Sequence, residues 1–132
     1  MSKNIYGIHH IALKCHGYEH FKKAVEFYRD VLGLEVAHEW DDGDNSRMLL
    51  DTGAGFIEIL ANGDDISREG SIRHVALAVR DTDAIIEIAR NAGYPITVEP
   101  KDIVIPSGTP FPARIGYCQG PAGEAVEFFC VK

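Results

Sequence analysis

Two histidines and two glutamates stand at matching places in the two halves of this sequence. His10 and His74 each open a short apolar run, and Glu58 and Glu127 each interrupt another apolar run near the end of a half. The histidine pair and the glutamate pair are separated by nearly the same number of residues. A supersecondary unit that occurs twice accounts for this spacing. Imidazole and carboxylate groups together suit a divalent metal such as Zn, Ni, Co, Mn or Fe.

Strand alternation predicts which way these side chains point. Successive side chains of a strand face opposite sides, so His10 lies opposite Ile11, and Glu58 lies opposite Ile57 and Ile59. By the same alternation His9 should lie on the face opposite His10. A carboxylate among apolar neighbours is costly unless it is paired or bound to a metal. Two interpretations stay open: one metal site formed by all four residues, or four separate roles in core hydrogen bonds and surface ion pairs.

The elements that hold these residues follow the order β-α-β-β-β in each half. Apolar residues at helical spacing predict the helices, and short apolar runs between turn residues predict the strands. In the first half we expect a strand at 5–15, a helix at 18–32 and strands at 34–40, 47–51 and 56–60. In the second half we expect a strand at 72–79, a helix from an Asp81 cap to residue 92, and strands at 95–99, 114–119 and 124–131.

Polar and proline-rich segments complete the predicted architecture. Residues 62–70 read as a linker between unit 1–62 and unit 70–132 of one domain, 1–132. Residues 101–112 contain three prolines and are expected to form a long loop at the rim of a cavity. The predicted fold class is α+β, with two tandem βαβββ units that form a curved, mostly antiparallel sheet around a cavity.

Composition narrows the classes of function. The formal net charge is −7 without a block of like charge, which disfavours nucleic acid as a partner. No apolar run is long enough to span a bilayer, and the first residues do not resemble a signal peptide. Three cysteines form no CxxC pair and are expected to be reduced and mostly buried. These features predict a cytoplasmic protein with no membrane and no nucleic-acid partner.

Two motifs resemble a known family. Residues 27–34, Phe-Tyr-Arg-Asp-Val-Leu-Gly-Leu, are similar to the "FY-x-x-x-LG" signature of the vicinal-oxygen-chelate superfamily. Residues 120–127, Gly-Pro-Ala-Gly-Glu-Ala-Val-Glu, resemble its closing "DPxGxxxE" turn and strand, with Gly120 where aspartate is usual. The resemblance covers nearly the whole chain and implies a glyoxalase-like fold.

Within that superfamily the residues most resemble glyoxalase I (lactoylglutathione lyase). The resemblance implies that His10, Glu58, His74 and Glu127 bind one divalent metal (Ni, Zn, Co or Mn). It also implies that Glu127 and Glu58 are catalytic, with Glu127 removing a proton next to a carbonyl and Glu58 returning it. Asn62 stands where glyoxalase I has an asparagine near its thiol cofactor. Lys14 stands where that enzyme usually has an arginine for a glutathione carboxylate.

The resemblance also implies a class of ligand and an assembly. The expected substrate is a small α-oxo or α-hydroxycarbonyl compound, such as a methylglyoxal–thiol hemithioacetal, with glutathione or another small thiol as cosubstrate. A homodimer is expected, because many relatives pair chains to complete their sites. Alternatives within the same fold are a drug-binding resistance protein, a metal-dependent epimerase and an Fe(II) dioxygenase. The bleomycin-resistance members typically lack the metal ligands, which favours an enzyme.

Overall fold

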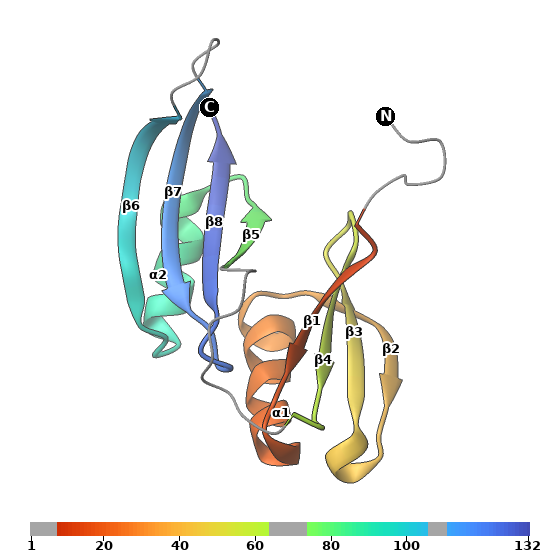
Figure 1. Ribbon diagram of the computed structural model, residues 1–132. Coiled ribbons are helices and arrows are strands. Elements are labelled where there is room, and N and C mark those ends of the chain that lie inside the picture. The colour runs from red at the N-terminus through yellow and green to blue at the C-terminus, as the bar shows by residue number, and fades with distance from the viewer. Residues whose placement is uncertain (1–7, 64–73, 106–110) are drawn as a thin grey trace, which may run out of the picture. The chain divides into compact units, whose positions relative to one another are not determined.

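A computed structural model describes residues 8–63, 74–105 and 111–132 (Figure 1). The chain divides into two compact units, Met1–Arg68 and Glu69–Lys132. Each unit contains a four-stranded sheet with one parallel and two antiparallel strand pairs. The α+β fold class and the repeated β-α-β-β-β order predicted from the sequence are confirmed.

In the first unit the first and last strands of the chain segment lie side by side. Its elements are β1 (His10–Lys14), α1 (Gly17–Val25), the π-helical segment η1 (Glu26–Val31), β2 (Glu35–Trp40), the 3-10 turn η2 (Gly43–Asn45), β3 (Arg47–Asp51) and β4 (Phe56–Leu60). The sheet order is β1-β4-β3-β2, and β1 runs parallel to β4. Strands β3 and β4 have the predicted bounds, because residues 52–55 form a polar turn between two apolar runs.

The helix predicted at 18–32 is present but changes form at Glu26. From there the backbone turns widen, and the Leu32 N–H donates to the carbonyl of Phe27. Phe27 and Tyr28 lie in this wider part and are fully buried, with ring centroids 4.8 Å apart in an edge-to-face arrangement. Gly33 follows at φ 80°, a left-handed conformation that glycine adopts without strain and that ends the helix.

The second unit repeats this arrangement. Its elements are β5 (His74–Ala78), α2 (Thr82–Asn91), β6 (Ile96–Ile105), β7 (Phe111–Gln119) and β8 (Ala125–Val131). The sheet order is β5-β8-β7-β6, with β5 parallel to β8, and α2 lies along one face of this sheet (Figure 1). The predicted cap is confirmed, since the Asp81 carboxylate accepts a hydrogen bond of 3.0 Å from the Ala84 N–H.

The prediction of a loop at 101–112 is wrong at both ends. Residues 101–105 continue β6 and pair with β7, which begins at Phe111. Ile103 and Val104 favour an extended strand, and Pro100 lies where the pairing register shifts between Val98 and Lys101. A proline is tolerated at such an irregularity because its missing N–H interrupts no regular ladder. Of the three prolines in 101–112, Pro112 lies in β7, whereas Pro106 and Pro110 fall within 106–110, outside the described residues.

Other sequence predictions concern the ends of elements. The strand predicted at 5–15 is shorter and spans His10–Lys14, and residues 1–7 are not among those described. Most of the predicted linker at 62–70 is also outside the described ranges. Among the residues that the structure does describe, no helix combines the length and the apolar character needed to cross a membrane.

Candidate functional site

The first unit brings His10 and Glu58 together. Strands β1 and β4 run parallel in a register that pairs Ala12 with Glu58, so His10 precedes the glutamate's partner by two residues. Both side chains therefore point to the same face of the sheet. His10 Nε2 lies 3.6 Å from Glu58 Oε1, and the Glu58 side chain is 16% exposed. The alternating exposure of β1, with His10, Ala12 and Lys14 exposed, agrees with the predicted faces.

The second unit builds the same pair from different residues. Strands β5 and β8 run parallel and pair Ala76 with Glu127, so His74 again precedes the glutamate's partner by two residues. His74 Nε2 lies 3.3 Å from Glu127 Oε1, and the Glu127 side chain is only 9% exposed. The small residues Ala76 and Ala78 on this face are exposed. Each unit thus contributes one imidazole and one carboxylate in an identical strand register.

The separation within each pair suits two ligands of one metal ion. Two ligand atoms, each about 2.1 Å from a metal and separated by an angle of about 90–110°, lie about 3.0–3.4 Å apart. The observed Nε2–Oε1 distances of 3.3 and 3.6 Å come close to that range. No cluster of three or more His, Cys, Asp or Glu side chains suited to a metal occurs among the described residues. Each unit therefore brings one histidine and one glutamate together, and the four-ligand set stays a prediction.

His9 contacts the His10 ring, and strand alternation does not predict this contact. β1 begins at His10, so His9 lies before the regular strand. Its Nδ1 lies 2.9 Å from Nδ1 of His10, and its ring also contacts Phe56 at a centroid distance of 5.1 Å. A proton held between these two nitrogens and carried by His10 leaves His10 Nε2 with a free lone pair. Metal-binding histidines usually have such a partner at their second nitrogen.

Tyr117 is a site residue that the sequence reasoning missed. It lies on β7 directly opposite Glu127 of β8. Its ring meets the His74 ring edge to face at 5.7 Å between centroids. Burial raises the pKa of Tyr117, and the Glu127 carboxylate, which accepts its hydrogen bond, adds to that increase. The hairpin turn at 120–123 was the available signal, because counting back from Glu127 through it reaches Tyr117.

Arg47 is a second residue that the sequence reasoning missed. Its Nη1 lies 4.0 Å from Glu58 Oε2, the carboxylate oxygen other than the one nearest His10. Its guanidinium also lies over the Trp40 ring, 5.5 Å from the centroid. Because Arg47 and Glu58 are on neighbouring strands, β3 and β4, counting through the turn at 52–55 would have placed them near one another.

Lys14 and Asn62, the predicted cofactor-binding residues, lie at the same end of the parallel pair. Lys14 is the last residue of β1 and pairs with Leu60, the last residue of β4. Asn62 follows two residues later, is exposed and bridges to His16. Backbone hydrogen bonds to Cys15 and Gly17 hold the segment after β4 close to the end of β1.

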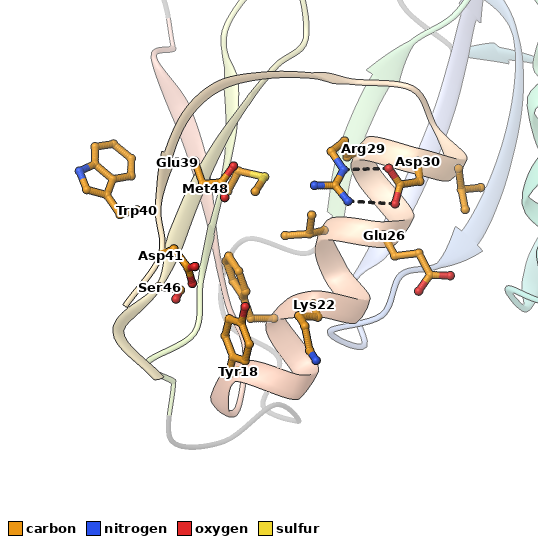
Figure 2. A pocket seen from close by; sticks show the side chains of 13 residues that line it. Tyr18, Lys22, Glu26, Arg29, Asp30, Glu39, Trp40, Asp41, Ser46 and Met48 are labelled. Carbon is orange, nitrogen blue, oxygen red and sulfur yellow. Dashed lines mark hydrogen bonds and ion pairs between the residues drawn. The ribbon is translucent and has the colours of Figure 1, made fainter. Parts of the chain in front are cut away.

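A groove of about 550 Å3 lies between α1 and the sheet of the first unit. Figure 2 shows Met48 and Glu39 on its sheet side and Arg29, paired with Asp30, on its helix side. Trp40 belongs to its rim, but the indole projects away from α1 (Figure 2). None of the predicted site residues lines this groove. The groove is therefore separate from the face that carries His10 and Glu58.

Comparison with known proteins identifies the family of this fold. Residues 7–128 match the family model of the Glyoxalase/Bleomycin resistance protein/Dioxygenase superfamily. No curated protein matches the chain. Solved structures that resemble it include a glyoxalase/bleomycin resistance protein/dioxygenase from Alicyclobacillus acidocaldarius, at 21% identity and a TM-score of 0.67. That match covers 98% of this chain and 95% of the other.

Two further similar structures have different described functions. One is the trypanothione-dependent glyoxalase I of Leishmania major, at 18% identity and a TM-score of 0.66, over 92% of this chain and 84% of that one. The other is an antibiotic-binding protein from a Streptomyces species, at 15% identity and a TM-score of 0.71, over 99% and 100%. Likenesses at these identities establish the fold only. One of the two similar structures is an enzyme and the other is a binding protein.

Proposed function

The chain belongs to the Glyoxalase/Bleomycin resistance protein/Dioxygenase superfamily, and we propose that it is a metal-dependent lyase or isomerase of the glyoxalase I kind. It moves a proton next to a carbonyl group of a small α-oxo or α-hydroxycarbonyl compound. A hemithioacetal of methylglyoxal and a small thiol, such as glutathione, fits this class.

The observation that carries the proposal is the repeated His–Glu pair. Each unit has a histidine and a glutamate in the same strand register, with ring nitrogen and carboxylate oxygen 3.6 and 3.3 Å apart. In this proposal His10, Glu58, His74 and Glu127 bind one metal ion per chain. That stoichiometry holds for a site within one chain and for a site shared in the proposed homodimer. A bound divalent cation supplies Lewis acidity, which stabilises negative charge on the substrate oxygens.

Glu127 is the general base of this proposal. Its side chain is only 9% exposed, and its Oε1 lies 3.3 Å from His74 Nε2. Glu127 takes the proton from the carbon next to the carbonyl, and Glu58, protonated at the start, gives its proton to the adjacent carbon. Proton exchange with water then returns both carboxyl groups to their starting states. Tyr117 holds the Glu127 carboxylate through its hydroxyl hydrogen bond. One C–H bond breaks and another forms at the adjacent carbon, while the hydroxyl proton moves to the former carbonyl oxygen, so the net change is an isomerisation.

Lys14 and Asn62 would hold the thiol part of the substrate. Their common position at the ends of β1 and β4 supports a shared role. The ammonium group of Lys14 attracts a carboxylate, and the Asn62 amide offers a donor and an acceptor. Lysine acts as a point charge and lacks the bidentate fork of arginine, so a thiol other than glutathione fits this position equally well.

Metal content beside turnover tests the proposal. The wild type is expected to bind about one Ni²⁺ or Zn²⁺ per chain and to melt at a higher temperature with the metal present, because the ligand binds only the folded state. Glu127→Gln should retain the fold and lose about 10²–10⁴-fold in the rate of α-proton exchange. His74→Ala should lose metal, because it removes an imidazole ligand outright.

Matched controls separate these effects from general damage. Glu87→Gln changes an exposed glutamate of α2, and His20→Ala changes a histidine of α1; both should bind metal as the wild type does. A wild type that binds neither metal, and whose melting temperature ignores both, would remove the metal site. Metal uptake without exchange of substrate α-protons would instead contradict the proposed reaction.

A further inference from the structure

The register of the first sheet aligns two cations in one row beside Glu58. Lys14 pairs with Leu60, Leu60 with Arg47, and Arg47 with Trp40, so the row crosses all four strands. The adjacent row is Ala12, Glu58, Leu49 and His38. Side chains two residues apart on a strand share a face, so both rows belong to the face that carries His10. Glu58 is the one carboxylate in these two rows.

Arg47 is held in place within this row and keeps donors for a ligand. Its guanidinium lies over Trp40, and the indole in turn stacks on His38 with ring centroids 4.5 Å apart and planes 16° apart. The contact with Glu58 is 4.0 Å, which is too long for a hydrogen bond. The Arg47 side chain is 45% exposed. A positioned guanidinium with open donors binds carboxylates through two parallel hydrogen bonds.

The two cations define the part of this face that favours an anionic ligand. Lys14 lies two strands from Arg47, about 10 Å away at the usual spacing of about 4.8 Å between strands. Leu60 separates the two cations and is 9% exposed. Within the two rows Lys14 and Arg47 outweigh the single charge of Glu58, whereas Asp51 and Glu35 lie in the row on the other side of Glu58, with His10. An anion therefore meets attraction along the row of Lys14 and Arg47, away from the row of Asp51 and Glu35.

We propose that Arg47, held against Trp40, binds a carboxylate of the substrate beside the metal ligand Glu58. The substrate is then an α-oxo or α-hydroxycarbonyl compound that carries a further carboxylate group. Arg47 sets specificity in this proposal and does not take part in proton transfer. The proposal rests on the function proposed above, because it assigns a substrate class to the same site.

Two matched probes isolate the role of Arg47. 2-Oxoglutarate and 2-oxopentanoate share the 2-oxo acid end and differ by a distal carboxylate. Titration calorimetry of the Ni²⁺-loaded wild type should show 2-oxoglutarate binding about 10- to 100-fold more tightly, the range for a charged hydrogen-bond pair. Arg47→Met should abolish that preference and leave the affinity for 2-oxopentanoate unchanged. Arg47→Lys should restore part of it, since it keeps the charge without the fork.

Arg29→Met is the matched control, because Arg29 lines the groove beside α1 and is paired with Asp30. It should keep the full preference for 2-oxoglutarate. Every variant should keep the metal content and the melting temperature of the wild type. Equal binding of the two probes by the wild type, failure of both to bind, or loss of the preference in Arg29→Met would each overturn the proposal.

The two proposals fail in different ways. A wild type that retains Ni²⁺ but does not distinguish the probes refutes the role of Arg47 and leaves the proposed function standing. A wild type that retains no metal refutes the proposed function. In that case the same titrations without metal decide on Arg47: a preference that Arg47→Met removes supports a carboxylate site, and no preference refutes it.

Discussion

Replacing Gly116 by alanine should destabilise the second unit, because β7 lies against α2 with no room for a side chain. A Cβ at position 116 would lie 2.9 Å from Cγ1 and 3.0 Å from Cδ1 of Ile86, and 3.4 Å from Cγ2 of Thr82. Both neighbours are buried, and the Thr82 hydroxyl donates to the Arg114 carbonyl at 2.9 Å. Neither side chain can swing into solvent. Overpacking of this kind costs about 1–3 kcal/mol, and we expect about 2 kcal/mol for Gly116→Ala.

A double-mutant cycle with Ile86 tests the steric explanation. Ile86→Val removes Cδ1 and should alone lower the free energy of unfolding by about 1 kcal/mol. In the double variant the loss of Cδ1 removes the 3.0 Å contact with the new methyl group, while the contact with Cγ1 remains. The combined loss should therefore be about 1 kcal/mol less than the sum of the two single losses. Urea denaturation followed by circular dichroism is the suitable assay, because the one tryptophan, Trp40, lies in the other unit.

Gly93→Ala is the control for this cycle. A Cβ at position 93 meets no atom within 4 Å, but the residue has φ 91°, so alanine there is strained by backbone conformation alone. Its cost should not respond to Ile86→Val. An additive Gly116–Ile86 double variant, or a Gly116→Ala protein within about 0.5 kcal/mol of the wild type, would refute the steric explanation. A lower α-proton exchange rate is also expected for Gly116→Ala, because the next residue is Tyr117.

Three further predictions concern α2, pH and assembly. Asp81→Ala should lower the free energy of unfolding by about 1 kcal/mol, because it removes the α2 cap; Asp81→Asn, which keeps an acceptor, should cost less in the same urea assay. Burial raises the pKa of Cys118 from 9.0 to about 12, so stability is full below pH 9 and falls as the pH rises toward 12, where only the unfolded chain releases the thiol proton. When the pH rises from 8 to 10.5, the free energy of unfolding should therefore fall by about 2 kcal/mol less in Cys118→Ala than in the wild type. Light scattering at micromolar concentration should report a homodimer, and a monomer would contradict that expectation.

Local physical chemistry made much of this fold predictable from the sequence. The bounds of β3 and β4 and the Asp81 cap of α2 follow from apolar runs and from residues with a strong local preference. The sides on which His10 and Glu58 lie follow from strand alternation, which depends only on neighbours in the chain. The repeat of His and Glu was visible because the two similar units follow one another along the chain.

The errors in the secondary structure arose where pairing overrides local preference. Residues 101–105 contain a lysine and an aspartate next to a proline, and they form a strand because β7 supplies hydrogen bonds to them. The widening of the helix at Glu26 has no such local signal either; it accompanies the burial of both Phe27 and Tyr28. His9 departs from the predicted alternation because the regular strand begins one residue later.

The His–Glu pairs of the candidate site were decided by tertiary structure. Alternation states which face a side chain occupies, but it does not state which strand lies next to it or in what register. Parallel pairing of the first and last strands of each unit sets the contacts of His10 with Glu58 and of His74 with Glu127. Such contacts depend on how distant segments align, which is a property of the whole sheet. The sequence therefore determined the kinds of group available for chemistry, whereas strand register determined which groups surround each glutamate.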